Sequence, residues 1–381
     1  MTIHWCGTGL SAIPGLRRLI ASGHDVQVWN RTVEKAREAV GDLTDKIAVF
    51  DMDVLTAALA PGDVVVSMLP GDWHVPLAEM SITKGAHFVS SSYIAPEMRA
   101  LNAGAKAAGV ALVNEVGLDP GIDHLMAHAM LGQYSASDAF SPSNATHFLS
   151  YCGGIPKTPN TFRYKFSWSP LGVLKALRSP SKSIRDGQPF DVARPWDAIS
   201  SYVAPLPTTE SFEVYPNRDS LPFMDQYGLS ADWNTQTFVR GTLRLNGWAE
   251  AWGDVFTEIE TLEGASGDAR LREMSDQFWA QNAYDAGEPD RVVLCVDLKA
   301  EAEGKAVWHK TYVLDAWGDG AGTAMARLVS VPVSLAVEAV IAGRIGAGVS
   351  AAPSAPELVA EWMEVVGQLS QHLTVVDHLD G

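Results

Sequence analysis

The first 113 residues alternate between short apolar strands and amphipathic helices, and this alternation restricts the fold more than any other feature of the chain. Apolar runs of four to six residues suit strands buried on both faces of a parallel sheet. Strands are expected at residues 2–6, 25–29, 47–50, 64–68 and 87–90, with a sixth ending at Val113, and helices at 13–22, 33–40, 54–60, 77–84 and 96–108. Strands that alternate with helices predict an α/β domain with a doubly wound parallel sheet.

A glycine-rich turn follows the first strand and precedes the first helix. It reads Gly7-Thr8-Gly9-Leu10-Ser11, and Pro14 follows in the first turn of the helix. The first glycine permits a tight turn, and the second lets the backbone approach a pyrophosphate at the helix N-terminus. Ala12 stands where a third glycine is usual, which the pattern permits. The turn therefore predicts dinucleotide binding, with a purely structural turn as the alternative.

The residues after the second strand indicate which dinucleotide binds. An acidic residue here would accept the ribose 2′-hydroxyl of NAD, but the chain has Asn30-Arg31-Thr32. A guanidinium and a hydroxyl suit a 2′-phosphate, so the predicted cofactor is NADP(H). The alternative is that Arg31 is merely solvated and that Thr32 caps the next helix.

The sequence changes character beyond position 125. Longer, aromatic-rich strands are expected at 147–151, 238–248, 291–301 and 307–316, with loop and edge structure over 179–207. Helical periodicity returns at 323–342 and 356–369. These patterns predict a second α+β domain with a mixed sheet.

Composition excludes several classes of partner. Twenty-eight basic and 45 acidic residues give a net charge of −17, which disfavours nucleic acid and anionic membranes. Cys6, Cys152 and Cys295 lie far apart, so neither a disulfide framework nor a metal site is expected. The first strand leaves no room for a leader, and no apolar run is expected to reach the ~18 residues of a membrane span. The protein is expected in the cytoplasm, with a small-molecule substrate and no membrane partner.

The segment NEVGLDPGIDH, residues 114–124, carries two carboxylates on an irregular turn after the sixth strand. Gly117, Pro120 and Gly121 force the turn, which leaves Asp119 and Asp123 near a strand's carboxyl end, where ligands bind in open α/β sheets. His124 is a possible general base. Asp123 and His124 fit the start of the next helix better, so Asp119 is the first carboxylate to test.

Five motifs in order give the chain a family resemblance. They are NEVGLDPGIDH, SYCGG at 150–154, YKFSWS at 164–169, YPNRDS at 215–220 and RGTLR at 240–244. Together they resemble the saccharopine reductase family, the NADP-dependent, glutamate-forming saccharopine dehydrogenases. The resemblance implies reduction of the imine formed by glutamate and 2-aminoadipate 6-semialdehyde, or the reverse oxidation of saccharopine, in lysine metabolism.

The resemblance also implies an architecture. A Rossmann-like NADP-binding domain would comprise residues 1–124 and about 321–381, and a substrate and dimerisation domain about 125–320. The chain is then expected to form a homodimer. The region 246–289 is shorter than the helical insertion of the fungal enzymes, so a reduced lid is expected.

Carried over motif by motif, the resemblance implies two sets of contacts. Those to the cofactor fall on Gly7, Gly9, Leu10, Ser11, Asn30, Arg31, Thr32, Asp51, Met52, Ser67, Leu69, Ser91, Leu118, Asp119 and Pro120. Those to saccharopine fall on Ser92, Tyr93, Asp119, Trp168, Arg218, Thr242 and Arg244, and Asp119, Tyr93 and Cys152 are the candidate acid–base residues.

Physical chemistry suits these roles, because arginines bind carboxylates through charge-assisted hydrogen bonds and saccharopine has three carboxylates. Each residue also has a plainer interpretation. Arg218 could only stabilise its loop through Asp219, Arg244 could lie on a solvated strand face, and Trp168, Tyr93 and Cys152 could be packing residues. The alternative functions are a related reductase for a carboxynorspermidine-type or opine-type product, and a non-catalytic NADP-binding protein.

Overall fold

The computed structural model describes residues 1–379, which divide into two compact units. The first comprises Met1–Leu125 and Ala326–Val366, and the second Met126–Met325 and the segment from Gly367 onward. The prediction from sequence was that about 321–381 belongs to the first unit. The structure places the final segment with the second unit, because its strand pairs there with strand β14 (Lys305–Trp317).

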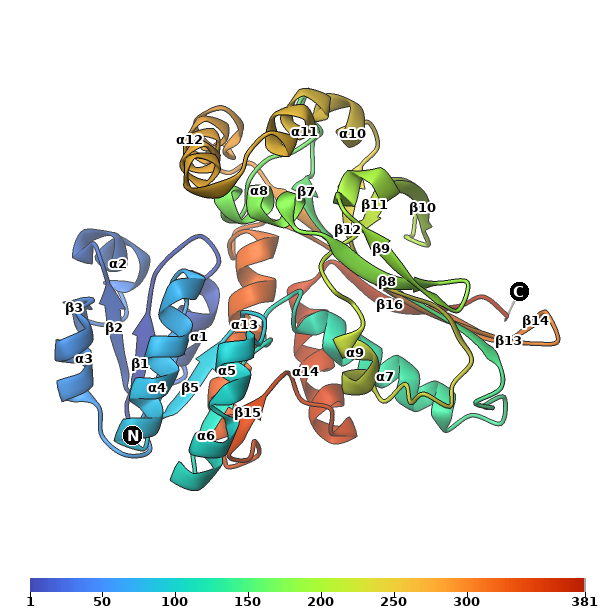
Figure 1. Cartoon of the computed structure of the whole chain (residues 1–381). Coiled ribbons are helices and arrows are strands. Elements are labelled where there is room, and N and C mark those ends of the chain that lie inside the picture. Colours follow the sequence, from blue (N-terminus) through green and yellow to red (C-terminus); the bar gives the residue numbers. More distant parts are fainter. Residues whose placement is uncertain (380–381) are drawn as a thin grey trace. The chain divides into compact units, whose positions relative to one another are not determined.

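The first unit is built on a parallel seven-stranded sheet with strand order β15-β6-β5-β4-β1-β2-β3 (Figure 1). Its strands are β1 (Ile3–Cys6), β2 (Val26–Asn30), β3 (Ile47–Val49), β4 (Val64–Ser67), β5 (His87–Ser90), β6 (Ala111–Val113) and β15 (Gly348–Ser350). All neighbours pair in parallel, which confirms the predicted doubly wound sheet. The six predicted strands are present, and β15 adds a seventh from the C-terminal part of the chain.

Helices follow each strand, as the alternation predicts. They are α1 (Ile13–Ala21), α2 (Val33–Val40), α3 (Met52–Ala58), the 3-10 turn η1 (Gly71–Trp73), α4 (His74–Lys84), α5 (Pro96–Ala100), α6 (Asn102–Ala108), α13 (Ala324–Ile341) and α14 (Pro356–Leu369). Helix α7 (Ile122–Ser135) begins in this unit, and most of its residues belong to the second unit. The helix predicted at 96–108 is two helices that meet at Leu101. Buried side chains of α3 to α6 pack with Trp29, Val65, Phe88 and Leu112 of the sheet in one hydrophobic cluster.

Helix α1 packs so closely on α13 that a glycine is required at the contact. The Gly15 amide donates to Ser330 Oγ at 2.8 Å, and a Cβ on Gly15 would lie 1.9 Å from the Ser330 carbonyl oxygen. Since that neighbour is backbone, it cannot move aside cheaply. Gly15 therefore allows the close helix approach, whereas Ala12, also buried, occupies the position of the usual third glycine.

We expect Gly15→Ala to lower the free energy of unfolding by about 1–3 kcal/mol or more, because overpacking forces backbone shifts. Gly132→Ala is the matched control, since Gly132 also lies in a helix but its added Cβ would meet nothing within 4 Å. That control should be neutral or gain up to about 1 kcal/mol from helix propensity. Urea unfolding measures the free energy of unfolding of both variants. Equal values for Gly15→Ala and Gly132→Ala would contradict the proposed close packing at Gly15.

The second unit is built on a nine-stranded mixed sheet, whose main path runs β10-β11-β12-β7-β13-β14-β16. Its strands are β7 (Ala145–Pro156), β8 (Ser181–Arg185), β9 (Gln188–Val192), β10 (Ser200–Ala204), β11 (Glu210–Pro216), β12 (Thr235–Leu245), β13 (Asp290–Ala302), β14 and β16 (His372–Asp377). Strands β7 and β12 pair in parallel, and the other pairs are antiparallel. The predicted mixed sheet is confirmed.

The helices of this unit carry an aromatic core. They are α8 (Pro170–Arg178), η2 (Pro195–Ala198), α9 (Pro222–Tyr227), α10 (Trp248–Ala251), α11 (Gly253–Glu260) and α12 (Gly264–Asn282). Trp248 and Trp252 are fully buried in one cluster with Tyr164 and Phe166. The prediction that strand 238–248 includes Trp248 is wrong, because Asn246 and Gly247 turn the chain and Trp248 begins α10.

Strand register separates the side chains of the mixed sheet into two faces. Cys152 of β7 lies opposite Thr242 of β12, so both belong to what we call the Cys152 face. Leu149 of β7 lies opposite Asp297 of β13, and Asp297 lies opposite Thr311 of β14. Successive side chains of a strand point to opposite faces. Positions 149 and 152 differ by three, so Asp297 and Thr311 lie on the other face, the Asp297 face.

Helix α13 is the most hydrophobic helix of the chain. Its 18 residues have a mean hydropathy of 1.7, so length and composition alone would allow a membrane span, contrary to the expectation that no apolar run is long enough. However, 83% of this segment is buried within the protein, as in the core helix of a folded domain.

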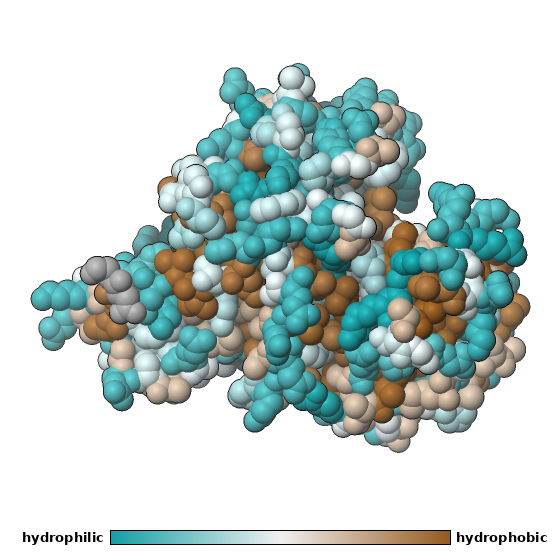
Figure 2. Space-filling view, turned by 180° about the vertical axis from the view of Figure 1, so that it is seen from behind, coloured by the Kyte–Doolittle hydropathy of each residue, from teal (hydrophilic) through white to brown (hydrophobic). Residues whose placement is uncertain are grey.

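Figure 2 shows a mainly hydrophilic face on which hydrophobic residues form smaller patches.

Candidate functional site

The glycine-rich turn lies at the carboxyl end of β1, beside the end of β4. The Gly7 amide donates to the Trp29 carbonyl, and the Met68 amide donates to the Cys6 carbonyl, both at 2.8 Å. Gly7 has φ +103°, and a Cβ there would lie 2.8 Å from the Met68 oxygen, so the turn needs glycine. Strand order reverses between β1 and β4, and such switch points bind ligands.

The turn leaves groups that suit a pyrophosphate. Gly9 and Leu10 are exposed and Ser11 is half-buried, so backbone at the start of α1 can be approached from solvent. A Cβ on Gly9 would meet nothing within 4 Å. Thr8 Oγ1 is buried and has no hydrogen-bond partner among residues 1–379. These positions fit the predicted phosphate loop.

Asn30, Arg31 and Thr32 stand at the end of β2, beside this turn. Asn30 Oδ1 accepts from the Thr8 amide at 3.2 Å, and Asn30 Nδ2 donates to the Thr32 carbonyl at 2.8 Å, so Asn30 joins the two loops. Thr32 occupies the N-cap position of α2 but makes no side-chain capping bond. The exposed Arg31 side chain makes no hydrogen bond or ion pair within the described chain. Both side chains are available to a ligand.

Asp51 and Met52 follow β3. Asp51 is the N-cap of α3, because its carboxylate accepts from the amides of Asp53 at 2.9 Å and Val54 at 3.0 Å. Met52 packs against the hydrophobic cluster of the first unit. The structure thus gives Asp51 a capping role, and its contact with cofactor stays a prediction.

A buried histidine connects the ends of β4 and β5. His74 Nδ1 lies 2.9 Å from Ser67 Oγ, and its Nε2 lies 2.8 Å from Ser92 Oγ. Burial lowers the pKa of His74 to about 4, so the ring is neutral at physiological pH. Leu69 and Ser91 lie on the same two loops. No pattern in the sequence marks His74, because only folding brings Ser67 and Ser92 to either side of it.

The segment 114–124 forms a compact turn at the end of β6. A Cβ on Gly121 would lie 2.1 Å from the Gly117 oxygen, and the Gly117 amide donates to the Pro120 carbonyl at 2.9 Å. Leu118 is buried, and the Asp119-Pro120 peptide bond is cis. Tyr93 donates its hydroxyl hydrogen to Asp119 Oδ1 at 2.8 Å. The structure therefore brings together two of the three candidate acid–base residues.

The other carboxylates of this segment are buried. Glu115 Oε1 accepts from the Ile94 amide at 2.9 Å, and its Oε2 lies 3.1 Å from His124 Nε2. Asp123 Oδ1 accepts from the Gly121 amide at 2.7 Å, and Asp123 lies in the first turn of α7. Glu115, Asp123 and His124 are each at most 3% exposed. They hold the turn in place, as expected for the start of a helix, and Glu115 was not singled out in the sequence.

In the second unit, the Cys152 face carries two of the predicted substrate residues, Thr242 and Arg244. Thr242 of β12 lies between Cys152 of β7 and Tyr215 of β11 in the strand register. Cys152 is 8% exposed. Burial raises the pKa of Tyr215, and the nearby Arg244 guanidinium partly opposes this rise. Tyr215 thus stays protonated and can donate a hydrogen bond on this face.

Arg244 is a buried cation on the same face. It is only 5% exposed, so the alternative of a solvated strand position is wrong. Its guanidinium carbon lies 4.8, 5.4 and 5.7 Å from the ring centroids of Tyr164, Trp248 and Tyr215. Nη1 donates to the Leu243 carbonyl at 3.2 Å, while Nε has no partner among residues 1–379.

No carboxylate within the described chain neutralises Arg244. Glu213 is its partner in the strand register, but the Glu213 carboxylate accepts from the amides of Gly247 and Ala249, each at 2.8 Å. No ion pair within 4.0 Å joins Arg244 to any described carboxylate. A buried charge is costly unless it is paired, so this site calls for an anionic ligand.

Trp168 and Arg218 occupy less buried positions. Trp168 Nε1 donates to the Tyr164 hydroxyl at 3.3 Å, which places Trp168 beside a ring that contacts Arg244. Arg218 is exposed after β11, with φ +58°. Asp219 accepts from the Leu221 amide at 3.0 Å, so its carboxylate stabilises the loop through backbone.

The parallel sheet, the glycine turn at its switch point and the polar residues at the ends of β2, β4 and β5 define a dinucleotide-binding α/β protein. Two family models match the chain. The saccharopine dehydrogenase NADP binding domain matches residues 3–113, and the saccharopine dehydrogenase C-terminal domain matches residues 117–369. The chain therefore belongs to the saccharopine dehydrogenase family, and the resemblance noted in the sequence is confirmed.

Curated relatives agree. The chain is 36% identical over 251 residues to saccharopine dehydrogenase (NADP(+), L-glutamate-forming) of Pyricularia oryzae, covering 64% of this chain and 54% of that protein. It is 36% identical over 259 residues to the Saccharomyces cerevisiae protein of that name, covering 64% and 55%. It is 27% identical over 378 residues to bovine alpha-aminoadipic semialdehyde synthase, covering 81% and 40%. The aligned part thus spans about half the length of the fungal relatives.

Solved structures support the same fold. Apo saccharopine dehydrogenase (L-Glu forming) from Saccharomyces cerevisiae superposes with a TM-score of 0.80 and 26% identity, and the match covers 99% of each chain. Homospermidine synthase from Legionella pneumophila, solved with NAD, superposes with a TM-score of 0.63 over 99% of this chain and 91% of that one. At 11% identity, the second likeness shows the fold alone.

Proposed function

We propose that this protein is an NADP-dependent oxidoreductase that forms or oxidises saccharopine. In the forming direction, glutamate and 2-aminoadipate 6-semialdehyde condense to an imine, which is reduced by hydride from NADPH. The reverse direction oxidises the secondary amine of saccharopine and hydrolyses the imine. The main support for a substrate with carboxylates is Arg244, which is buried and has no carboxylate partner in the described chain.

The first unit fits NADP. A Cβ on Gly7 would collide with the Met68 carbonyl oxygen, so the turn requires glycine there. Thr8 Oγ1 is buried without a hydrogen-bond partner in the described chain, and Arg31 is exposed just after β2. When bound, the cofactor supplies or accepts the hydride. The backbone of Gly9 to Ser11 would hold the pyrophosphate, and Arg31 with Thr32 would hold the 2′-phosphate. Ser67, Leu69, Ser91 and Leu118 to Pro120 are proposed to complete the contacts, as are Asp51 and Met52.

The second unit fits a substrate that carries carboxylates. Arg244 can bind one through charge-assisted hydrogen bonds, and Thr242 and Tyr215 can donate beside it. Arg218 is proposed to bind a second carboxylate, and Trp168 to pack on the aliphatic chain. Of the first-unit residues, Ser92 and Asp119 are proposed to contact saccharopine as well.

Imine chemistry also needs proton transfers during carbinolamine formation and dehydration. The hydrogen-bonded pair Tyr93 and Asp119 is the proposed acid–base group, because the Tyr93 hydroxyl donates to Asp119 Oδ1 at 2.8 Å. Asp119 can also pair with a substrate ammonium. Cys152, next to Thr242, is the second proposed acid. We further propose that the protein acts in the cytoplasm as a homodimer.

The direct test is reduction of NADP by purified protein with saccharopine, compared with opines and carboxynorspermidine. We expect activity with saccharopine and at least about 100-fold lower kcat/KM with carboxynorspermidine, because its single carboxylate leaves either Arg244 or Arg218 without a substrate partner. Preferred turnover of a carboxypolyamine or an opine would support the related-reductase alternative. NADPH binding without turnover of any pair would support the non-catalytic one.

A further inference from the structure

A second polar site lies on the Asp297 face, away from the residues proposed to bind saccharopine. Asp297 of β13 lies opposite Thr311 of β14, and His309 is two residues before Thr311 on the same strand. Side chains two apart on a strand share a face, so these three groups are neighbours. His378 joins them from the end of β16, where its amide donates to the His309 carbonyl at 3.0 Å.

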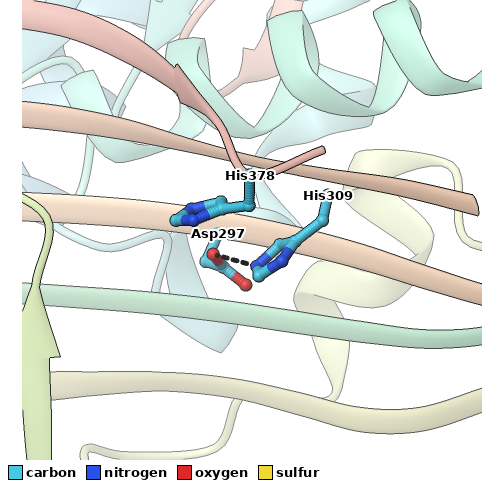
Figure 3. Close-up of side chains that lie close together, drawn as sticks. All are labelled: Asp297, His309 and His378. Carbon is cyan, nitrogen blue, oxygen red and sulfur yellow. Dashed lines mark hydrogen bonds and ion pairs between the residues drawn. The ribbon is translucent and has the colours of Figure 1, made fainter. Parts of the chain in front are cut away.

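The side chains of this cluster converge, as Figure 3 shows. His309 Nε2 lies 3.1 Å from Asp297 Oδ2, and the rings of His309 and His378 stack with centroids 4.0 Å apart. One ligand atom from each of Asp297, His309 and His378 can be chosen so that all lie within 4.8 Å of one another. We propose that Asp297, His309 and His378 bind a divalent transition-metal ion such as Zn²⁺.

The donor set selects the class of metal. Two imidazoles and one carboxylate suit Zn²⁺ and its first-row neighbours, whereas Mg²⁺ and Ca²⁺ prefer sets of oxygen ligands. Zn²⁺ binds nitrogen at about 2.0–2.1 Å, so tetrahedral ligand atoms lie roughly 3.3 Å apart. The cluster therefore needs to contract by at most roughly 1.5 Å. His378 is exposed at the end of a strand, so its side chain can make this movement.

The surroundings favour a cation. Thr311 Oγ1 lies 2.5 Å from Asp297 Oδ2 and 2.8 Å from His378 Nε2, which orients two of the three ligands. The nearby lysines are neutralised, because Lys299 pairs with Glu301 and Lys310 pairs with Asp377. The cluster lines a cavity of about 390 Å³, whose wall includes a further imidazole, His147. This space can hold water in the remaining coordination position.

The expected consequence of binding is structural. Among the described strands, β16 pairs with β14 alone, and its last residues are held through His309 and Lys310. A metal held by β13, β14 and His378 would clamp the end of this strand to the sheet. Because the site lies on the opposite face from Cys152 and Thr242, its occupancy is measured independently of dehydrogenase activity.

The test is titration of untagged full-length protein with ZnCl₂ by calorimetry, with CoCl₂ as a spectroscopic probe of coordination. We expect one equivalent of Zn²⁺ to bind, and His309→Gln and His378→Gln each to weaken it at least about 10-fold. His372→Gln is the matched control, since His372 lies on β16 outside the cluster. The Zn²⁺ affinity of this variant should equal that of the wild type. His378 is exposed, so its variant should fold.

The melting temperature gives a second measurement. Zn²⁺ should raise it in the wild type and in His372→Gln, and should not raise it in His378→Gln. Equal Zn²⁺ affinity in the wild type and both cluster variants would overturn the proposal. So would the absence of binding up to 1 mM, roughly the weakest affinity expected of a specific site, or an equal response to MgCl₂.

Discussion

Replacing Arg244 with methionine should lower kcat/KM for saccharopine by roughly 10²–10³-fold, which corresponds to about 3–4 kcal/mol of lost binding to a buried charge partner. Arg244 is 5% exposed, and its guanidinium has no carboxylate within 4.0 Å in the described chain, so a substrate carboxylate is its expected counter-ion. Methionine keeps an apolar stem against Tyr164 and Trp248 and removes only the charge. The measurement is steady-state NADP reduction at varied saccharopine.

Stability separates this interpretation from a structural one. Removing an unpaired buried charge should leave the free energy of unfolding unchanged or raise it by about 1–4 kcal/mol. If Arg244 were instead a structural residue, its replacement would lower the free energy of unfolding as well as kcat/KM. Arg272→Ala, at an exposed helix position, is the matched control and should alter neither quantity. A methionine variant with normal kinetics would remove Arg244 from the site.

Arg218→Ala provides a comparison within the same assay. Arg218 is exposed, so a carboxylate held there stays partly solvated and its loss should cost less than that of Arg244. We expect the Michaelis constant for saccharopine to rise by about 10-fold, as for one charge-assisted hydrogen bond. If only Arg244→Met impairs the enzyme, a single carboxylate anchors the substrate.

The architecture of the first unit was predictable because its signals are local. Each strand and helix is marked by its own period and by nearby glycines, and β1 to β6 lie where the apolar runs are. The glycine-rich turn was recognisable for the same reason, since Gly7 and Gly9 follow the end of β1. Only β15 lacked a local signal, because its three residues pair with β6 from more than 200 positions away.

The sites depend on contacts that no local pattern encodes. In the sequence, Arg244 is one of two basic residues on its strand, and its burial follows from Tyr164 and Trp248, which other segments supply. His74 and Glu115 are similar cases, since the serines and amides that they bind come from other loops. Asp297, His309 and His378 come from three different strands or their ends, so no metal-binding spacing exists in the sequence.

The proposed preference for NADP rests on the exposed Arg31 side chain, so Arg31→Asp should reverse it. The loop after β2 positions Arg31 through Asn30, which bonds both Thr8 and Thr32, so the substitution should leave the loop in place. A charged hydrogen bond to the 2′-phosphate contributes about 1.5–3 kcal/mol, and an aspartate there adds repulsion. The dissociation constant of NADPH should therefore rise by roughly 100-fold or more.

NADH lacks the 2′-phosphate, so its binding should change by less than about threefold or improve, because aspartate can accept the ribose 2′-hydroxyl. Fluorescence titration of both reduced cofactors against the wild type and the variant measures the ratio directly. Arg37→Asp, at an exposed position of α2, introduces the same charge change without the proposed contact. If Arg37→Asp and Arg31→Asp weaken NADPH equally, general electrostatics explains the preference, and the 2′-phosphate is held elsewhere.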